Sequence, residues 1–301
     1  MILKHLVYLD ALARERHFRR AAEACNVSQP TLSAALTQLE TELGVMIVER
    51  DRQFKGLTHE GELVLAHARR ILAGAEVLRQ SVAEGRQGVS GRLRLGAIPT
   101  ALPMIAEVTG PYCERFPNVS LTVLSLNSHE IERRIAEFEL DAGITYLDNE
   151  PLENVIVNPI YQESYVLLVR DDDPGLTSQT EIAWIEAAPL KLCLLTPDMQ
   201  NRRIIDGIFR SVGQVPVPVI ETNSIFNLCT HARLPGIASV VPRQLLEFFG
   251  TPIGTRALPL VRPEARRTIG LIVADRTPLP PIARNLMDMT RPVTAIEPVR
   301  A

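Results

Sequence analysis

Short polar side chains gather on one face of a helical stretch between residues 18 and 43. Hydroxyl and amide groups of this kind can donate to and accept from base edges in the major groove of DNA. A helix pair that merely faces solvent more often carries Lys and Glu there, so the pattern favours DNA reading over that plainer interpretation. The side chains on this face are Gln29, Thr31, Ser33, Thr37 and Gln38.

Two short helices with a tight corner between them would position this face. The first helix carries Arg19 and Arg20 on its outer side, and Asn26 tolerates the left-handed backbone that the corner needs. Ser28 is well suited to cap the second helix, and Pro30 falls in its first turn, where a missing N–H costs nothing. Small apolar residues at the crossing, followed by larger ones, complete a helix-turn-helix pattern.

Flanking segments predict the rest of a small DNA-binding unit. Apolar residues at helical spacing in residues 2–13 predict a leading helix that covers the pair. Two short strands, residues 45–50 and 53–58, are predicted to form a wing with Arg50 and Arg52 at its tip. An Arg on such a loop can lie along a phosphate backbone or enter a minor groove. The alternative is a solvated turn.

A long helix is predicted from Thr58, which would cap it, to about residue 86. Its apolar positions are separated by alternate steps of four and three residues, which is the spacing of a coiled-coil seam. Such a narrow seam favours pairing with a second helix of the same kind, and a helix of this length spans ~40 Å. The alternative is a helix that lies on its own domain. The seam residues are Val64, Ala68, Ile71, Ala75, Leu78 and Val82.

Strands and helices alternate beyond a flexible joint at residues 87–91. The order β-α-β-α-β predicts a parallel sheet with helices on its faces, and a second set of strands with its own helices predicts a second lobe. Two such lobes leave a cleft between them. The strands are predicted at residues 92–97, 119–126, 142–146, 165–169, 190–195, 217–221, 237–241 and 268–273, with a closing helix at about 282–289.

Hydroxyl residues follow three of these strands beside expected helix starts. Ligands in such folds sit beyond the carboxyl ends of the strands, where helix N-termini present free N–H groups and a partial positive charge. Thr100, Ser128 and Thr196 together therefore favour a small anion, most simply a carboxylate. Asn201, Arg202 and Arg203 follow shortly after and can add donors and charge. Each hydroxyl alone could instead be only a helix cap.

Composition argues against several other classes of protein. The net charge of −3 is not that of a non-specific polyanion binder. The cysteines, Cys25, Cys113, Cys193 and Cys229, are widely spaced, which favours buried reduced thiols and no metal site. No nucleophile turn or phosphate-binding loop is found, so neither catalysis nor a cofactor is expected. Without a signal pattern or an apolar run of ~18 residues, a cytoplasmic protein with no membrane segment is expected.

Two sets of motifs carry a family resemblance. The N-terminal set is RHFRRAA at 16–22, VSQPTLS at 27–33, QLE at 38–40, ELGV at 42–45 and ER at 49–50. The second set is Gly96-x-Ile98-Pro99-Thr100, LDAGI at 140–144 and GIAxVVP at 236–242. Over nearly the whole chain these motifs resemble those of the LysR-type transcriptional regulators.

The resemblance implies an α+β multidomain fold with an N-terminal winged helix-turn-helix, a long linker helix and a C-terminal two-lobed α/β effector-binding domain of the periplasmic-binding-protein type II kind. The domains would be residues 1–58, 59–88 and 89–301, with lobe I at about 91–161 and 268–301 and lobe II at about 162–267. It further implies a regulator, not an enzyme, that binds double-stranded promoter DNA as a homodimer or homotetramer. A small organic anion would be its effector.

Residues and resemblance together define two candidate sites. Ala34 and Ala35 depart from the pattern, because many members have Arg or Gln there, and this removes an expected phosphate contact. The candidate DNA contacts are Arg19, Arg20, Ser28, Gln29, Pro30, Thr31, Ser33, Gln38, Arg50 and Arg52. The candidate effector contacts are Thr100, Ser128, Thr196, Asn201, Arg202, Tyr146 and Phe226.

Within the family, the N-terminal half and residues 266–271 look like the peroxide-sensing branch. That branch needs two redox cysteines in the second lobe. Alignment on Gly207 and Gly213 puts Gln200 and Phe209 at those positions, and neither can form a disulfide. A bound metabolite is therefore the favoured signal. The alternative is a thiol- or peroxide-responsive regulator that uses other cysteines.

Bulky side chains near the presumed cleft indicate a small effector, one that could be as small as formate. These side chains are Tyr146, Met199 and Phe226.

Overall fold

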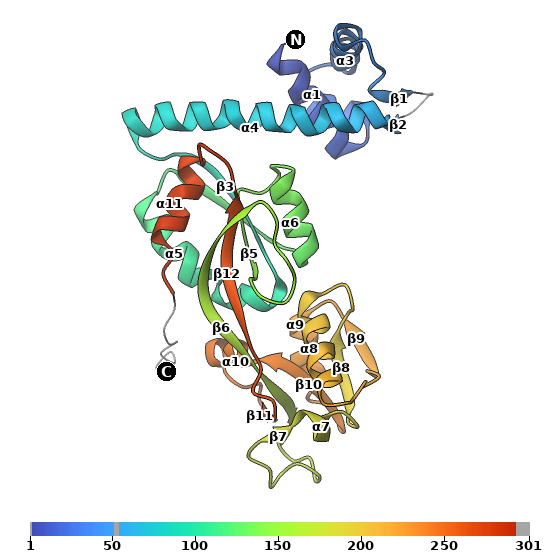
Figure 1. The fold of residues 1–301 in the computed structure, drawn as a ribbon, viewed down its shortest axis with the longest axis vertical. Helices are drawn as coiled ribbons and strands as arrows, with labels where there is room; N and C mark the ends of the chain where they lie inside the picture. The colour runs from blue at the N-terminus through green and yellow to red at the C-terminus, as the bar shows by residue number, and fades with distance from the viewer. Residues whose placement is uncertain (1, 51–53, 293–301) are drawn as a thin grey trace. The chain divides into compact units, whose positions relative to one another are not determined.

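The computed structural model describes residues 2–50 and 54–292. The chain divides into two compact units, Met1–Gly88 and Val89–Ala301 (Figure 1). Each unit has a hydrophobic core of its own, so each is described by itself.

Three helices and their buried leucines form the core of the first unit. Leu9, Leu12, Leu32 and Leu36 are fully buried among them. Ala21 is also fully buried, and a side chain of that size lets neighbouring helices approach closely. Burial of each leucine contributes about 1.5–3 kcal/mol. The helices are α1 (Leu3–Glu15), α2 (Phe18–Ala24) and α3 (Gln29–Leu43).

The corner between α2 and α3 follows from local chemistry. Asn26 adopts a left-handed backbone with φ of 56°, and Val27 packs against the core. The Ser28 side chain caps α3 by accepting a hydrogen bond from the Thr31 N–H at 3.3 Å. Gly44 ends the helix with φ of 69°. The predicted corner and cap are thus confirmed.

A two-stranded wing follows, formed by β1 (Val48–Arg50) and β2 (Phe54–Leu57). The strands are antiparallel, with Val48 opposite Leu57, and both are shorter than predicted. A buried carboxylate ties the wing to α3, because Glu40 accepts the N–H groups of Ile47 and Val48 at 3.0 and 3.1 Å.

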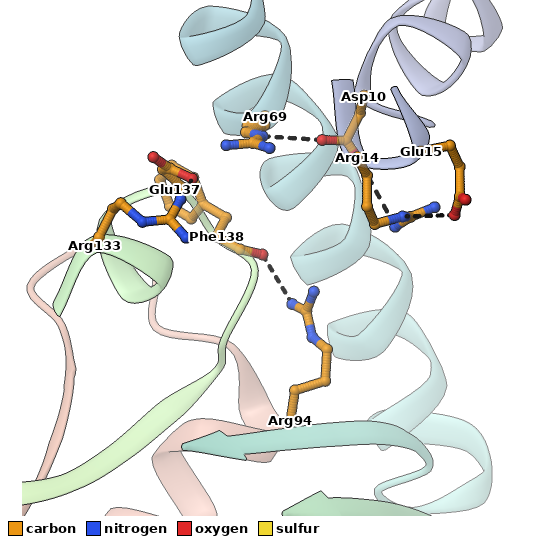
Figure 2. A network of polar contacts seen from close by, with 8 residues as sticks. All are labelled: Asp10, Arg14, Glu15, Arg69, Arg94, Arg133, Glu137 and Phe138. Atoms are coloured by element: carbon orange, nitrogen blue, oxygen red, sulfur yellow. Dashed lines mark hydrogen bonds and ion pairs between the residues drawn. The ribbon is translucent and has the colours of Figure 1, made fainter. Parts of the chain in front are cut away.

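The long helix α4 (His59–Gln87) begins at its predicted cap, where Thr58 accepts the Gly61 N–H at 2.9 Å. Arg69 donates to Asp10 at 2.9 Å and so fastens α4 to α1 (Figure 2). The predicted seam is divided in two. Val64 and Ala68 pack into the first unit's core, whereas the exposed fractions of Ile71, Leu78 and Val82 are 44%, 65% and 55%.

The second unit is built on a mixed sheet with the order β4-β3-β5-β12-β6-β10-β8-β9. Strands β3, β4 and β5 are parallel, which confirms the predicted β-α-β-α-β segment. Strand β12 is antiparallel to both of its neighbours. The strands are β3 (Gly91–Ala97), β4 (Val119–Ser125), β5 (Ala142–Tyr146), β6 (Val155–Arg170), β8 (Lys191–Leu195), β9 (Ile220–Thr222), β10 (Ile237–Pro242) and β12 (Arg266–Ala274).

Strand β6 connects the two lobes of this unit. Its first part pairs with β12 as far as Ser164, and its last part pairs with β10 and with β11 (Thr255–Val261), which also contacts β7 (Ile182–Ala183). The sequence predicts only residues 165–169 as strand. Residues 165–169 are buried and form a continuous apolar run, which the sequence pattern detects. Residues 155–159 are not buried and do not form such a run, so the pattern misses them.

Helices cover the sheet in both lobes. Figure 1 shows α5 and α11 on one side of the first lobe's sheet and α6 on the other. Arg94 on β3 donates to the Phe138 carbonyl oxygen at 2.9 Å (Figure 2). It also donates to Asp141 at 2.9 Å, and so holds the segment after α6. The helices are η1 (Pro99–Met104), α5 (Ile105–Arg115), α6 (Ser128–Ala136), α7 (Trp184–Ala187), α8 (Gln200–Ser211), α9 (Ile225–His231), α10 (Arg243–Phe249) and α11 (Pro281–Met289).

Candidate DNA-binding and effector sites

The outer face of α3 carries the predicted base-reading side chains. Gln29, Pro30, Thr31 and Gln38 are exposed, and Ser33 is half-buried. Gln29 and Pro30 stand at the start of the helix, in the part of a recognition helix that commonly reaches base edges. This face is therefore free to approach a duplex.

Several of these polar groups are engaged within the helix. The Ser28 and Thr31 hydroxyls lie 2.8 Å apart, so this pair shapes the start of α3. The Gln38 amide donates to Glu42 at 3.2 Å. A base contact by Gln38 would have to replace that bond.

The arginines on α2 are held by acidic and carbonyl groups. Arg19 pairs with Glu23 at 2.9 Å, and Arg20 donates to the Glu15 carbonyl oxygen at 2.6 Å. The exposed fractions of the Arg19 and Arg20 side chains are 75% and 63%, so both can still turn toward a phosphate. Arg50 is the last residue of β1, and the predicted wing contact Arg52 lies outside the described residues.

A small pocket in the second unit brings together residues of both lobes. Its lining includes Thr100 after β3, Ser128 after β4, Tyr146 at the end of β5 and Asn201 in the first turn of α8. These predicted effector residues thus meet at the carboxyl ends of parallel strands. The cavity volume is about 10 Å³, room for about one water molecule. The remaining lining residues are Ile98, Pro99, Asn127, Leu195, Met199 and Gln200.

Two helix N-termini face this pocket. Asn127 caps α6 by accepting the Glu130 N–H at 2.9 Å, and Ser128 is the first residue of that helix. Helix α8 begins at Gln200 without a side-chain cap from Met199. Its first N–H groups have no partner within the helix and carry part of the helix dipole. The pocket is therefore suited to negative charge on its helix side.

Buried polar groups form a chain behind the pocket. The Tyr146 hydroxyl donates to Glu163 at 2.5 Å and accepts from the Asn201 amide at 3.0 Å. The Thr100 hydroxyl lies 3.3 Å from the same phenol oxygen. Burial raises the pKa of Glu163 to about 7, although the hydrogen bond from Tyr146 acts in the opposite direction. The sequence offers no signal for Glu163, because it becomes part of the site only when β6 passes between the lobes.

An ion pair joins the lobes at the edge of the pocket. Arg203 on α8 makes two hydrogen bonds to Glu150, at 2.7 and 2.8 Å, and also donates to Ser128 at 3.3 Å. The Arg203 guanidinium lowers the pKa of Glu150. Glu150 was not recognised in the sequence, because the loop that carries it lies far from α8 along the chain.

Three predicted effector residues lie elsewhere. Arg202 turns away from the pocket and is held by Asp206 at 2.9 Å and Glu221 at 2.6 Å. Phe226 has an exposed fraction of 71% and does not line the cavity. Thr196 does not line it either, because α8 begins later than expected, after Met199.

Gln200 and Phe209, the two residues that the sequence comparison put at the redox-cysteine positions, have side chains that cannot form disulfides. Gln200 lines the pocket, and Phe209 is buried in the core. The four cysteines of the chain are free thiols, but only Cys193 is buried as expected; Cys25 and Cys229 are half-buried, and Cys113 is exposed. Burial raises the pKa of Cys25 and Cys193, and it raises that of Cys229 to about 11.

No group of three or more His, Cys, Asp or Glu side chains in the described part of the chain is placed to hold a metal ion. None of its helices combines the length and the apolar character that crossing a membrane requires.

A winged helix-turn-helix unit followed by a two-lobed α/β unit with an interlobe pocket defines a class of protein, the ligand-responsive DNA-binding regulators. Two family models match the chain: the bacterial regulatory helix-turn-helix protein of the lysR family over residues 3–62, and the LysR substrate binding domain over residues 86–295. The chain belongs to the LysR family of transcriptional regulators. Members of this family are transcription factors, not enzymes.

Relatives and solved structures agree with this assignment. The chain is 30% identical over 280 residues to the DNA-binding transcriptional dual regulator OxyR of Escherichia coli K12, covering 93% of this chain and 91% of that protein. It is 31% identical over 227 residues to the regulator YdcI of the same organism, covering 74% and 73% of the two chains.

Two full-length structures show the same fold. An OxyR variant from Pseudomonas aeruginosa matches with a TM-score of 0.78 and 28% identity, covering 97% of this chain and 98% of that one. CbnR in complex with its target DNA matches with a TM-score of 0.68 and 19% identity, covering 96% and 99%.

Proposed function

We propose that this regulator is controlled by a small organic anion, a carboxylate of about the size of formate, bound between the lobes of its second unit. The observation that carries the proposal is the pocket itself. Thr100 and Ser128 supply hydroxyl groups, and the uncapped start of α8 supplies N–H groups and positive dipole charge. The cavity holds about one water molecule, so even a formate-sized anion would bind only with a small separation of the lobes.

Binding in this pocket can change the spacing of the two lobes, because the ligand would contact both of them. Ser128 and Thr100 belong to lobe I, and Gln200 and Asn201 to lobe II. A ligand that prefers one spacing of the lobes shifts the population toward that spacing. The Arg203–Glu150 ion pair at the pocket edge would strengthen or break with the same movement.

On the DNA side, α3 would enter the major groove of promoter DNA, with Gln29, Pro30, Ser33 and Gln38 at bases and backbone. The wing, with Arg50 and Arg52, would contact the phosphates. Arg19, Arg20, Ser28 and Thr31 would support these contacts. The exposed α4 residues would pair with a second copy to give a dimer or a dimer of dimers that acts in the cytoplasm.

A thermal-shift screen of small carboxylates tests the effector proposal. Formate or acetate should raise the melting temperature of the full chain, and Thr100→Ala or Ser128→Ala should reduce that shift. Thr109→Ala, on α5 and away from the pocket, is the matched control. A carboxylate shift that both pocket variants retain would place the anion elsewhere, and steady consumption of the carboxylate would indicate an enzyme instead.

The second candidate signal is thiol oxidation, favoured by the likeness to OxyR. Cys193 and Cys229 belong to one apolar cluster, but their raised pKa values leave little thiolate at neutral pH. Replacing all four cysteines by Ser should leave the carboxylate response intact. Loss of a peroxide response in that variant, together with no carboxylate response in the wild type, would favour the thiol mechanism.

A further inference from the structure

A buried carboxyl group stands directly behind the proposed effector pocket. Glu163 lies on β6, next to the point where this strand passes from one lobe to the other, and its side chain is fully buried. One carboxyl oxygen, Oε1, accepts the Tyr146 hydroxyl at 2.5 Å and the Asn201 amide at 3.5 Å. The other oxygen, Oε2, is buried without a hydrogen-bond partner among the described residues.

The groups around Glu163 do not neutralise a negative charge. Phenols face it from β5 and β6, namely Tyr146, Tyr161 and Tyr165, and burial raises their pKa values, so they stay protonated. From η1 and α8 come the Thr100 hydroxyl and the Asn201 amide.

Two arginines on elements beside Glu163 have hydrogen-bond or ion-pair partners other than Glu163. Arg267 is the cross-strand neighbour of Glu163 on β12, but its guanidinium donates to the Arg266 carbonyl oxygen at 2.8 Å. Arg202 on α8 is paired with Asp206 and Glu221. An ionised Glu163 would therefore be a buried charge without a counter-ion, which is costly.

The direction of one hydrogen bond links this carboxyl to the pocket. While Glu163 is ionised, Tyr146 must donate its proton to Glu163, and its oxygen presents only lone pairs to the pocket that it lines. Once Glu163 is protonated, the carboxyl can donate to the phenol oxygen instead. The Tyr146 O–H is then free to turn toward an anion in the pocket.

We propose that the interlobe pocket takes up a small anion together with one proton. Glu163 carries this proton and donates it in a hydrogen bond to the Tyr146 oxygen, and the Tyr146 O–H then donates to the anion. The inference rests on the proposed function, because it concerns the same pocket. The pKa of about 7 means that the proton is exchanged near neutral pH. By linkage, an anion that prefers the protonated site must raise the proton affinity of that site equally.

The test measures formate binding to the full chain by calorimetry between pH 6 and pH 9, a range in which formate itself stays ionised. In the wild type the affinity should be nearly constant below the pKa and fall about tenfold per pH unit above it. Glu163→Gln, whose amide is always able to donate to Tyr146, should bind with an affinity that does not change with pH and that exceeds the wild-type affinity at pH 9. Glu247→Gln, an exposed carboxyl on α10, is the matched control and should behave as the wild type does.

Two further measurements keep the result independent of how well Glu163→Gln folds. Repeating the wild-type titration at pH 8 in buffers of different ionisation enthalpy should show uptake of about one proton per formate. Tyr146→Phe lacks the hydroxyl group that would donate to the anion. It should bind formate weakly at pH 6, about as the wild type does at higher pH.

The outcomes separate the two proposals. Formate binding with no proton uptake, or a wild-type pH slope that Glu163→Gln retains, would overturn the coupling while leaving the anion site in place. Absence of formate and acetate binding in the wild type and in Glu163→Gln at every pH would overturn the anion site, and the coupling with it.

Discussion

At the scale of single residues, the two ends of this chain use polar groups in opposite ways. On α3 the predicted base-reading side chains are uncharged, and all but the half-buried Ser33 are exposed, so hydration competes with each base contact. In the effector pocket the polar groups are buried, so an atom that is left there without a partner, such as Asn201 Oδ1, carries a desolvation cost. The first arrangement suits discrimination among sequences, and the second suits detection of a small molecule.

Replacement of Gln29 by Ala should reduce the discrimination between a specific promoter fragment and random DNA by ~1–3 kcal/mol, because one amide contact to a base edge is lost. Fluorescence anisotropy with both DNAs at a fixed salt concentration measures this ratio. Gln214→Ala, in the second unit, should leave it unchanged. An unaltered ratio in Gln29→Ala would remove this residue from the base-reading set.

Glu163 should also make stability depend on pH. Its pKa is raised from 4.5 to about 7 in the folded chain, so its contribution is fully present below pH 4.5 and is lost as pH rises through about 7. The loss amounts to roughly 3 kcal/mol. Urea unfolding at several pH values should show this fall in the wild type relative to Glu163→Gln. Parallel curves for the two proteins would contradict the assignment.

At the scale of elements, the first unit depends on close contacts between backbone segments. Glu40 holds the start of the wing against α3, and Gly61 lets α4 pass the chain just before the wing. A Cβ atom at Gly61 would lie 2.1 Å from the Ile47 carbonyl oxygen, which is backbone and cannot swing away. The position of the wing relative to α4 therefore depends on this backbone contact, not on the intrinsic propensities of the two elements.

Gly61→Ala should destabilise the first unit by ~2 kcal/mol or more, since the backbone must shift to accommodate the methyl group. Gly74→Ala is the matched control on the same helix, because a Cβ there meets nothing within 4 Å. It should stabilise α4 by up to ~1 kcal/mol. Thermal unfolding of both variants measures the difference, and equal melting temperatures would show that the Ile47 contact is relieved at no cost.

At the scale of the whole molecule, the exposed part of α4 is the feature that a single chain leaves unexplained. Ile71, Leu78 and Val82 have exposed fractions of 44%, 65% and 55%, and they follow heptad spacing. A parallel or antiparallel partner helix would bury them. Assembly through this surface would give each DNA half-site its own reading helix.

Ile71→Asp should therefore break the assembly, because a charge would be buried in an apolar helix pair. Sedimentation velocity on the purified chain measures the effect. Leu63→Asp is the control, as Leu63 is an exposed leucine on α4 outside the seam. If Ile71→Asp sediments like the wild type, α4 is not the dimer contact.

The sequence by itself determined the parts whose cause is local. The corner at Asn26, the caps at Ser28 and Thr58 and the parallel strands 92–97 and 142–146 follow from backbone preferences, capping chemistry and apolar runs, all of which act over a few residues. The convergence of Thr100, Ser128 and Asn201 was also predictable, because each follows a strand and the carboxyl ends of parallel strands meet at one edge of the sheet.

Only the tertiary structure decided what lies behind and around these groups. It buried Glu163 beside Tyr146, paired Arg203 with Glu150, turned Arg202 toward Glu221 and left Phe226 exposed. The physical reason is distance along the chain. Whether a charged or aromatic side chain is buried, paired or exposed depends on segments that are remote in sequence and meet only when β6 and α8 bring the lobes together.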